Sequence, residues 1–232
     1  MVTGTPRMVT DGLVLYIDAA NTKSYPGSGT TWTDLSSTQT SGSLTNGPTF
    51  NTTNNGSIFF DGTNDFVDCG NNTIFNFAQQ FTYLAWIYPS VLNTYKAIIT
   101  HRNSASLTSQ TSLFISPNSK LYYELSNNSL QFYSGEDLTL TQNRWQMVGV
   151  SLDLSGNANL YLNTTSSNPN ASTILGPFSN FNQNIHIGRH TYSGFDGQYF
   201  SGRIAIVSIY NRALSATEVL QNFEATRERF GV

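Results

Sequence analysis

The sequence predicts an all-β protein, a sandwich of two antiparallel sheets with one short C-terminal helix. Apolar and polar residues alternate with period two in short runs along the chain, and helical periodicity occurs only near its end. Alternation places successive side chains on opposite faces of a strand, so that each strand can bury one face in a core. Aromatic residues make up 13% of the 232 residues, which supplies that core and excludes a disordered chain.

The expected strands are separated by breaks rich in Gly, Asn, Ser and Pro. Asp61-Gly62, Pro117-Asn118 and Asn127-Asn128 have the composition of tight turns. Residues 21–53 contain no long apolar run, and we expect ordered loops and short strands there. The alternating runs lie at residues 13–17, 57–60, 66–69, 81–88, 97–101, 112–115, 120–125, 145–152, 158–162, 185–188 and 202–210. About a dozen short strands at this spacing are typical of a two-sheet sandwich.

One helix is expected at the C-terminal end. Ser215 followed by Glu218 has the form of a capping box, which predicts that a helix begins there. Val219, Leu220 and Phe223 are expected on its packed face. Arg227, Glu228 and Arg229 follow near its end, where we expect solvent exposure and a favourable interaction with the helix dipole.

Charge and cysteine content exclude several classes of protein. The chain has 11 Lys and Arg against 14 Asp and Glu, a net charge of −3, so a nucleic-acid partner is not expected. The single cysteine, Cys69, excludes an internal disulfide and a cysteine-based zinc site. No apolar run approaches the about 18 residues of a membrane span, and the first residues lack the apolar core of an export signal. We therefore expect no membrane insertion.

Blocks of sequence spread over nearly the whole chain resemble one known family. They are GLVLYIDAANTKSYPGSGTTWTDLS near the start, then SIFFDGTNDFVDCG, FTYLAWIYPS, RWQMVGVSLD, NLYLNTT, NIHIGRH and FSGRIAIVSIYNRALSATEV, in this order. Together they resemble the laminin-G-like, concanavalin A-like lectin/glucanase superfamily. The resemblance implies a jelly-roll sandwich over residues 11–232, preceded by an N-terminal arm at residues 1–10.

The opening and closing blocks are most similar to single-domain versions in structural proteins of tailed bacteriophages. This resemblance implies a capsid decoration, fibre or tail protein on the virion surface, folded in the host cytoplasm. Its expected partners are glycans and other virion proteins, and a homo-oligomer is compatible with such a role. An extracellular location is the alternative.

The carboxylates do not form the pattern of a glucanase. Such enzymes need paired acids flanking the glycosidic bond, and no Glu-x-Asp-x-Glu run occurs. Glu136 and Asp137 are adjacent and are expected in a turn; in a strand they would face opposite sides. We therefore expect a non-enzymatic protein, and a glycoside hydrolase only if two carboxylates meet across strands.

Calcium is the only cofactor with support in the sequence, and none is required. Asp61, Asn64, Asp65 and Asp68 place four oxygen-bearing side chains within eight residues, and many members of the family hold Ca²⁺ in their loops. The alternative is that Asp61-Gly62 forms a turn and Asp65 caps local backbone amides. Ala205 and Ile206 stand where the family often has an acidic pair, which weakens the calcium interpretation.

Two loops carry the residue types of a sugar site. Aromatic rings stack on pyranose rings while polar side chains bond the hydroxyl groups. The candidates are Tyr95 and Arg102 in one loop region and His190, Tyr192, Phe195, Asp196 and Tyr199 in the other. The alternative is that these aromatic residues close the ends of the sandwich. The two main hypotheses are therefore a glycan-binding virion protein and a purely structural decoration or connector module without a glycan ligand.

Overall fold

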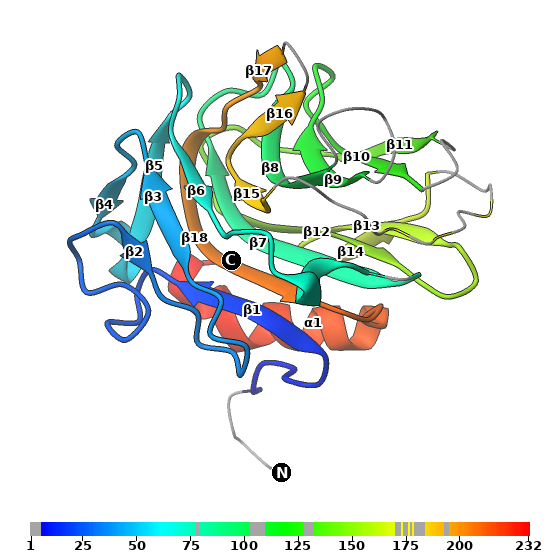
Figure 1. Cartoon of the computed structure of the whole chain (residues 1–232), viewed down its shortest axis with the longest axis horizontal. Coiled ribbons are helices and arrows are strands. Elements are labelled where there is room, and N and C mark those ends of the chain that lie inside the picture. The colour runs from blue at the N-terminus through cyan, green and yellow to red at the C-terminus, as the bar shows by residue number, and fades with distance from the viewer. Residues whose placement is uncertain are drawn as a thin grey trace.

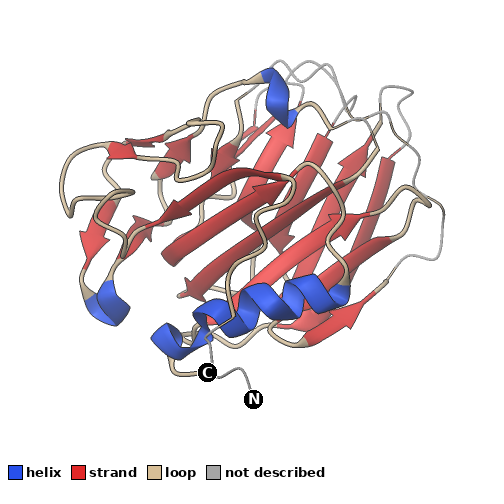
Figure 2. Ribbon diagram, turned by 90° about the horizontal axis from the view of Figure 1, so that it is seen from below, coloured by secondary structure: helices blue, strands red, loops and turns tan. Residues whose placement is uncertain are grey.

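The computed structural model confirms the predicted all-β sandwich. It describes residues 6–77, 79–102, 110–127, 132–169, 173, 176, 178, 184–192 and 195–232. In these residues two eight-stranded antiparallel sheets pack face to face, and a two-stranded hairpin lies above one of them (Figure 1). A single α-helix lies outside the other sheet (Figure 2).

The first sheet, sheet A, is built around its longest strand. Strand β18 (Ser201–Tyr210) pairs along most of its length with β7 (Phe81–Pro89). On its other side β18 pairs first with β5 (Ser57–Asp61) and then with β1 (Leu13–Asp18). The remaining strands are β12 (Gln146–Leu152), β13 (Ala158–Leu162) and β14 (Thr165–Ser167) beyond β7, and β4 (Thr49–Asn51) beyond β5.

The second sheet, sheet B, carries the features discussed below. Its strands, in spatial order, are β11 (Phe132–Thr139), β10 (Lys120–Ser126), β9 (Gln110–Ile115), β8 (Lys96–Arg102), β15 (His186–Ile187), β6 (Phe66–Asp68), β3 (Gly42–Thr45) and β2 (Thr31–Trp32). The hairpin consists of β16 (His190–Tyr192) and β17 (Phe195–Gly197). Two short 3₁₀ turns, η1 (Thr53–Asn55) and η2 (Thr73–Phe75), complete the loops.

The core between the sheets follows the predicted alternation. In β9, Leu113 and Ile115 are fully buried in the core, whereas Ser112 and Phe114 occupy the opposite face of the strand. All eleven runs predicted from alternation are strands. Such a core excludes water from one face of each sheet, and this is the main source of stability of the sandwich.

Two segments differ from the sequence prediction. Glu136 and Asp137, expected in a turn, lie in β11, and the loop expected around residues 190–197 forms the β16–β17 hairpin. β11 lacks an apolar alternation because it lies at a sheet edge and has Gly135 at a core-facing position. A Cβ there would meet the ring of Tyr123 at 2.6 Å, so the close packing itself requires glycine.

The C-terminal helix α1 (Ala216–Thr226) begins as predicted. The Ser215 side chain accepts a hydrogen bond from the Glu218 backbone amide, and the Glu218 carboxylate accepts one from the Ser215 amide. Arg212 donates to the same carboxylate at 2.6 Å, and this bond lowers the pKa of Glu218 to about 2. The capping box is therefore tied to the loop that leaves β18.

Helix α1 lies against the outer face of sheet A (Figure 2). It packs there through a narrow apolar stripe. The indole of Trp86 stacks on Phe223 at 5.7 Å and on Phe230 at 4.1 Å between ring centroids. The prediction for Leu220 is wrong, since its side chain is 42% exposed. Asn222 takes the buried position instead, because residues three and four apart share a helix face and Leu220 lies one residue outside the Val219, Asn222 and Phe223 stripe.

The prediction for Arg229 is also wrong. In the 3₁₀ turn η3 (Arg227–Phe230), Arg229 points inward and its side chain is 13% exposed. It donates to the Asp18 carboxylate at 2.5 Å and to the backbone carbonyls of Asn54 and Gly56. These contacts join the C-terminal turn to β1, which no local sequence pattern encodes.

The N-terminal residues that the structure describes lie on the helix. The backbone amide of Val9 donates to Asn222 Oδ1 at 2.8 Å, and the Tyr210 hydroxyl donates to the Val9 carbonyl at 3.0 Å. Gln221 donates to the Arg7 carbonyl. Across the described part of the chain, the helices are too short or too polar to cross a bilayer.

Candidate functional site

A row of polar and aromatic side chains lies on the outer face of sheet B. Strand register places Arg102 beside Gln110, Ser112 beside Glu124, and Phe114 beside Tyr122. Because these residues alternate with core residues, all six side chains share the face turned away from the core. We call this set of side chains the β8–β10 face: Tyr122 and Glu124 are half-buried, whereas Arg102, Gln110, Ser112 and Phe114 are buried.

Glu124 is held in place by its neighbours on this face. Its Oε1 accepts a hydrogen bond from the Tyr122 hydroxyl at 3.1 Å, and its Oε2 accepts one from the Gln110 side-chain amide. Burial, with the nearby Glu124 charge, raises the pKa of Tyr122, so this hydroxyl stays protonated and donates. Glu124 is half-buried, and each carboxylate oxygen can accept more than one hydrogen bond.

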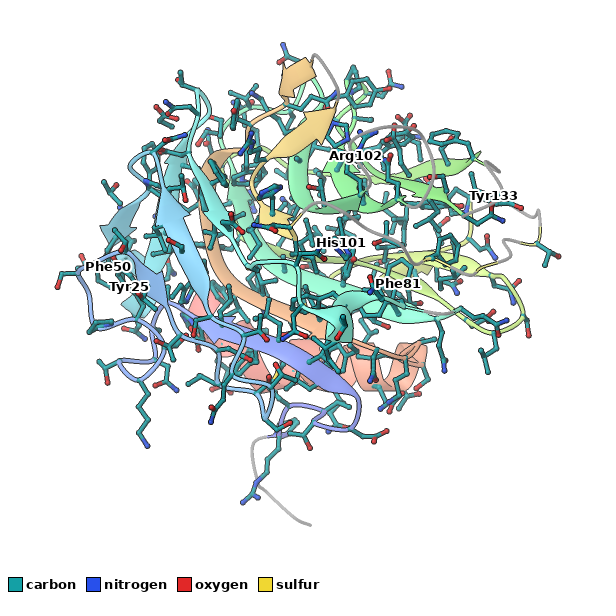
Figure 3. All side chains as sticks on the ribbon, in the orientation of Figure 1. Tyr25, Phe50, Phe81, His101, Arg102 and Tyr133 are labelled. Carbon is teal, nitrogen blue, oxygen red and sulfur yellow. The ribbon has the colours of Figure 1, made fainter. Side chains whose placement is uncertain are left out.

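Arg102 and His190 meet at the other end of the face. Arg102 Nη1 lies 2.7 Å from His190 Nε2, although β8 and the hairpin are far apart in the sequence. Burial first, and then the Arg102 charge, lowers the pKa of His190 to about 4. In Figure 3, Arg102 lies toward the hairpin, and His101, its neighbour in β8, lies toward the space between the sheets, where its ring meets Phe75 edge-on.

Aromatic rings connect the two groups in a continuous line. The ring centroid of Tyr95 lies 5.6 Å from that of Tyr122, which lies 6.1 Å from that of Phe114. Phe114 in turn lies 5.1 Å from the His190 ring, nearly perpendicular to it. Tyr95 is 39% exposed and Tyr122 is half-buried, whereas Phe114 is fully buried, so the line is open to solvent at its Tyr95 end.

The residues predicted from sequence fall partly on this site. The structure brings together Tyr95, Arg102 and His190 through the contacts above, and Tyr199, half-buried, follows β17. Tyr192 pairs with Phe195, and Thr191 with Asp196, in the backbone of the hairpin. The side chains of Tyr192, Phe195 and Asp196 lie outside the described part of the structure.

Sequence reasoning missed Gln110, Phe114, Tyr122 and Glu124. Their signal was the second face of alternating strands: in residues 110–115 and 120–125 the residues between the core positions are polar or aromatic. A strand that carries aromatic and acidic residues on the face away from the core is a candidate for a binding site, and not only for contact with solvent. The sequence of each strand could not show which strands are neighbours in the sheet.

Two carboxylates share the outer face of strands β10 and β11. Glu136 pairs with Tyr122 in the register and Glu124 with Ser134, so Glu124 and Glu136 are diagonal neighbours. Diagonal neighbours on a sheet are about 7–8 Å apart. Glu136 Oε1 accepts a hydrogen bond from the Asn118 side chain at 2.8 Å. Glu124 and Glu136 are therefore the two carboxylates that the hydrolase alternative would have to use.

The candidate calcium loop is held by its own backbone. Asp61 Oδ1 accepts from the amide of Thr63 at 2.7 Å, and these amide bonds lower the pKa of Asp61. Asp65 Oδ2 accepts from the Asp61 amide at 3.0 Å, and burial raises the pKa of Asp65. The Asn64 carbonyl accepts from the Asn46 side chain. Among the described residues no group of three or more His, Cys, Asp or Glu is arranged to hold a metal. The contacts are those of a capped turn.

The two-sheet antiparallel sandwich has the architecture of lectin-like domains. The sequence model of the concanavalin A-like lectin/glucanases superfamily matches residues 61–220. The chain belongs to this superfamily. A search of curated proteins found no match.

Solved structures of low sequence identity share the fold. Domain 4 of AbnA, a GH43 extracellular arabinanase from Geobacillus stearothermophilus solved with arabinotriose, is 16% identical with a TM-score of 0.70, covering 92% of this chain and 99% of its own. The binding domain of Paraclostridial Mosquitocidal Protein 1 is 18% identical with a TM-score of 0.68; the match covers 91% of this chain and 52% of that domain. The chain thus spans about half the length of that toxin domain.

A third structure extends the comparison to a carbohydrate-binding module. The Ruminococcus gnavus IT-sialidase CBM40, bound to α2,3 sialyllactose, is 15% identical with a TM-score of 0.59. That match covers 71% of this chain and 94% of the module. At these identities the likeness concerns the fold alone.

Proposed function

We propose that the chain is a non-enzymatic glycan-binding protein and that the β8–β10 face, with Tyr95 and His190, is its binding site. The observation that carries the proposal is the pair of rings that reach solvent, Tyr95 and Tyr122, beside the anchored Glu124 carboxylate. Rings that stack on sugars and fixed polar groups that bond hydroxyls are what a glycan site needs.

The exposed end of the face offers the first contact for a sugar ring. Tyr95 is 39% exposed, and its contact with Tyr122 fixes its position, so little side-chain entropy is lost on binding. Glu124 is hydrogen-bonded to the Tyr122 hydroxyl and presents oxygens that can accept hydrogen bonds from sugar hydroxyls. The similar structures named for arabinotriose and sialyllactose support a sugar ligand for this fold.

We place the protein on a virion surface, as a capsid decoration, fibre or tail component that binds host or environmental glycans. The support is the resemblance of its opening and closing blocks to bacteriophage structural proteins. Other virion proteins are its expected protein partners. A purely structural connector is the alternative, and mass spectrometry of purified particles carrying the chain tests the location.

A glycan array tests the binding function. We expect the wild-type chain to bind a defined set of oligosaccharides, and Tyr95→Ala to weaken that binding about tenfold by removing the stacking ring. Phe59→Ala is the matched control, because Phe59 is 40% exposed and faces outward from sheet A. Absence of binding by a folded wild-type chain, or equal loss in both variants, contradicts the proposed site and favours the connector.

The same preparation tests the hydrolase alternative. Glu124 and Glu136 are the two carboxylates to replace, one at a time, by Gln. We expect bound oligosaccharides to be recovered intact, with no reducing ends released. Hydrolysis abolished by either substitution would make the protein an enzyme.

A further inference from the structure

We infer that the β8–β10 face selects neutral glycans and rejects glycans that carry a carboxylate or sulfate group. This inference rests on the proposed function and names the class of sugar that the same site takes. It depends on which charges of the face are accessible and which are buried.

The accessible charges of the face are negative. Glu124 is half-buried and fixed by the Tyr122 hydroxyl and the Gln110 amide, so it cannot turn away from a ligand. Glu136, also half-buried, lies opposite Tyr122 on the neighbouring strand and accepts a hydrogen bond from Asn118. Glu124 thus lies two residues along the strand from Tyr122, and Glu136 lies beside Tyr122 on the side away from β9.

The positive charges of the described residues near this face are buried, turned to the other side of the sheet or held by other groups. Arg102 is 2% exposed, with Nη1 against the His190 ring. Lys96 pairs with Ile115, a core residue, and therefore lies on the opposite side of the sheet. Lys120 shares the outer side of β10 with Tyr122, but its ammonium lies 4.0 Å from the Asp137 carboxylate, which offsets its charge. The Arg189 guanidinium lies over the Phe66 ring on β6.

An anionic sugar would meet net repulsion at this face, because the Asp137 carboxylate offsets the Lys120 charge while Glu124 and Glu136 are both negative. Like charges placed together at an interface strongly disfavour the wrong partner, and a half-buried carboxylate is only partly screened by salt. Neutral hydroxyls instead donate to Glu124 and Glu136, and hydrogen bonds to a charged acceptor are the strong ones. Specificity therefore comes from a repulsive element built into the site.

The test compares matched pairs of neutral and acidic glycans. An array carries arabino-, gluco-, galacto- and manno-oligosaccharides, each beside its sialylated, uronate and sulfated derivative, and affinities of the bound pairs are then measured by calorimetry. We expect each acidic member to bind at least about tenfold more weakly than its neutral partner at low salt. Glu136→Gln is expected to reduce this difference in affinity several-fold, because it removes one negative charge and keeps the size and shape of the side chain.

The control for that variant is Glu228→Gln, which removes the same charge from an exposed side chain beside sheet A. It should leave the difference in affinity unchanged. Equal or tighter binding of the acidic members, or a difference that Glu136→Gln does not alter, overturns the inference while the glycan-binding function stands. Binding of no glycan at all overturns the proposed function and the inference together.

Discussion

Arg102 Nη1 lies 2.7 Å from Nε2 of His190, a residue 88 positions later in the chain. Because a guanidinium can only donate, His190 Nε2 accepts this bond and its proton resides on Nδ1. The contact therefore requires a neutral imidazole. It also ties the β16–β17 hairpin to the end of β8.

This pair predicts that stability falls as the solution becomes acidic. His190 has a folded-state pKa of about 4 against 6.5 in the unfolded chain, so between these values the unfolded state binds more protons. From about pH 7 to about pH 4.5 the free energy of unfolding should drop by roughly 2–3 kcal/mol more in the wild type than in His190→Gln. Denaturant titrations at both pH values measure the difference. An equal drop in both proteins would show that His190 is not the group responsible.

Removing the Arg229 side chain should destabilise the protein far more than removing that of Arg227. Arg229 is 13% exposed and holds the Asp18 carboxylate with two backbone carbonyls, so Arg229→Ala should cost about 2–3 kcal/mol. Arg227 is 41% exposed and pairs with Glu224 at the surface, so Arg227→Ala should cost less than about 0.5 kcal/mol. Urea unfolding of both variants makes the comparison, and similar costs would contradict the anchoring role of Arg229.

Helix α1 allows a second comparison, between one buried and one exposed apolar side chain. Phe223 is 5% exposed and stacks on Trp86, so Phe223→Ala should cost about 3–5 kcal/mol through the cavity it leaves. Leu220 is 42% exposed, and Leu220→Ala should change the free energy of unfolding by less than about 0.5 kcal/mol. A large effect at Leu220 would mean that this face of the helix is covered in solution.

Chelation tests the Asp61 loop. Because Asp61 and Asp65 accept backbone amides within the turn, we expect EDTA to leave the melting temperature and glycan binding unchanged. Asp65→Ala should destabilise the fold by about 1–3 kcal/mol, since it leaves the Asp61 amide without its acceptor. A melting temperature that falls with EDTA and recovers with added Ca²⁺ would restore the calcium interpretation.

The local pattern of the sequence determined the elements of the fold. Short apolar runs with period-two alternation located the strands from residues 13–17 to 202–210, and the Ser215 to Glu218 spacing located the start of the helix. Both signals are local, because the side-chain period of a strand and the hydrogen bonds of a helix cap involve residues a few positions apart. Family resemblance then supplied the arrangement of the two sheets.

Only the tertiary structure decided which surface residues meet. Tyr122 and Glu124 share a face by alternation, but their neighbours Gln110, Phe114 and His190 come from other strands whose order in the sheet is not written in the sequence. Arg229 is a second example. The residues near it in the chain predict exposure, but its ion pair with Asp18, near the other end of the chain, holds the side chain inside. Side chains far apart in sequence come together through strand order and register, and these are set by the packing of the whole core.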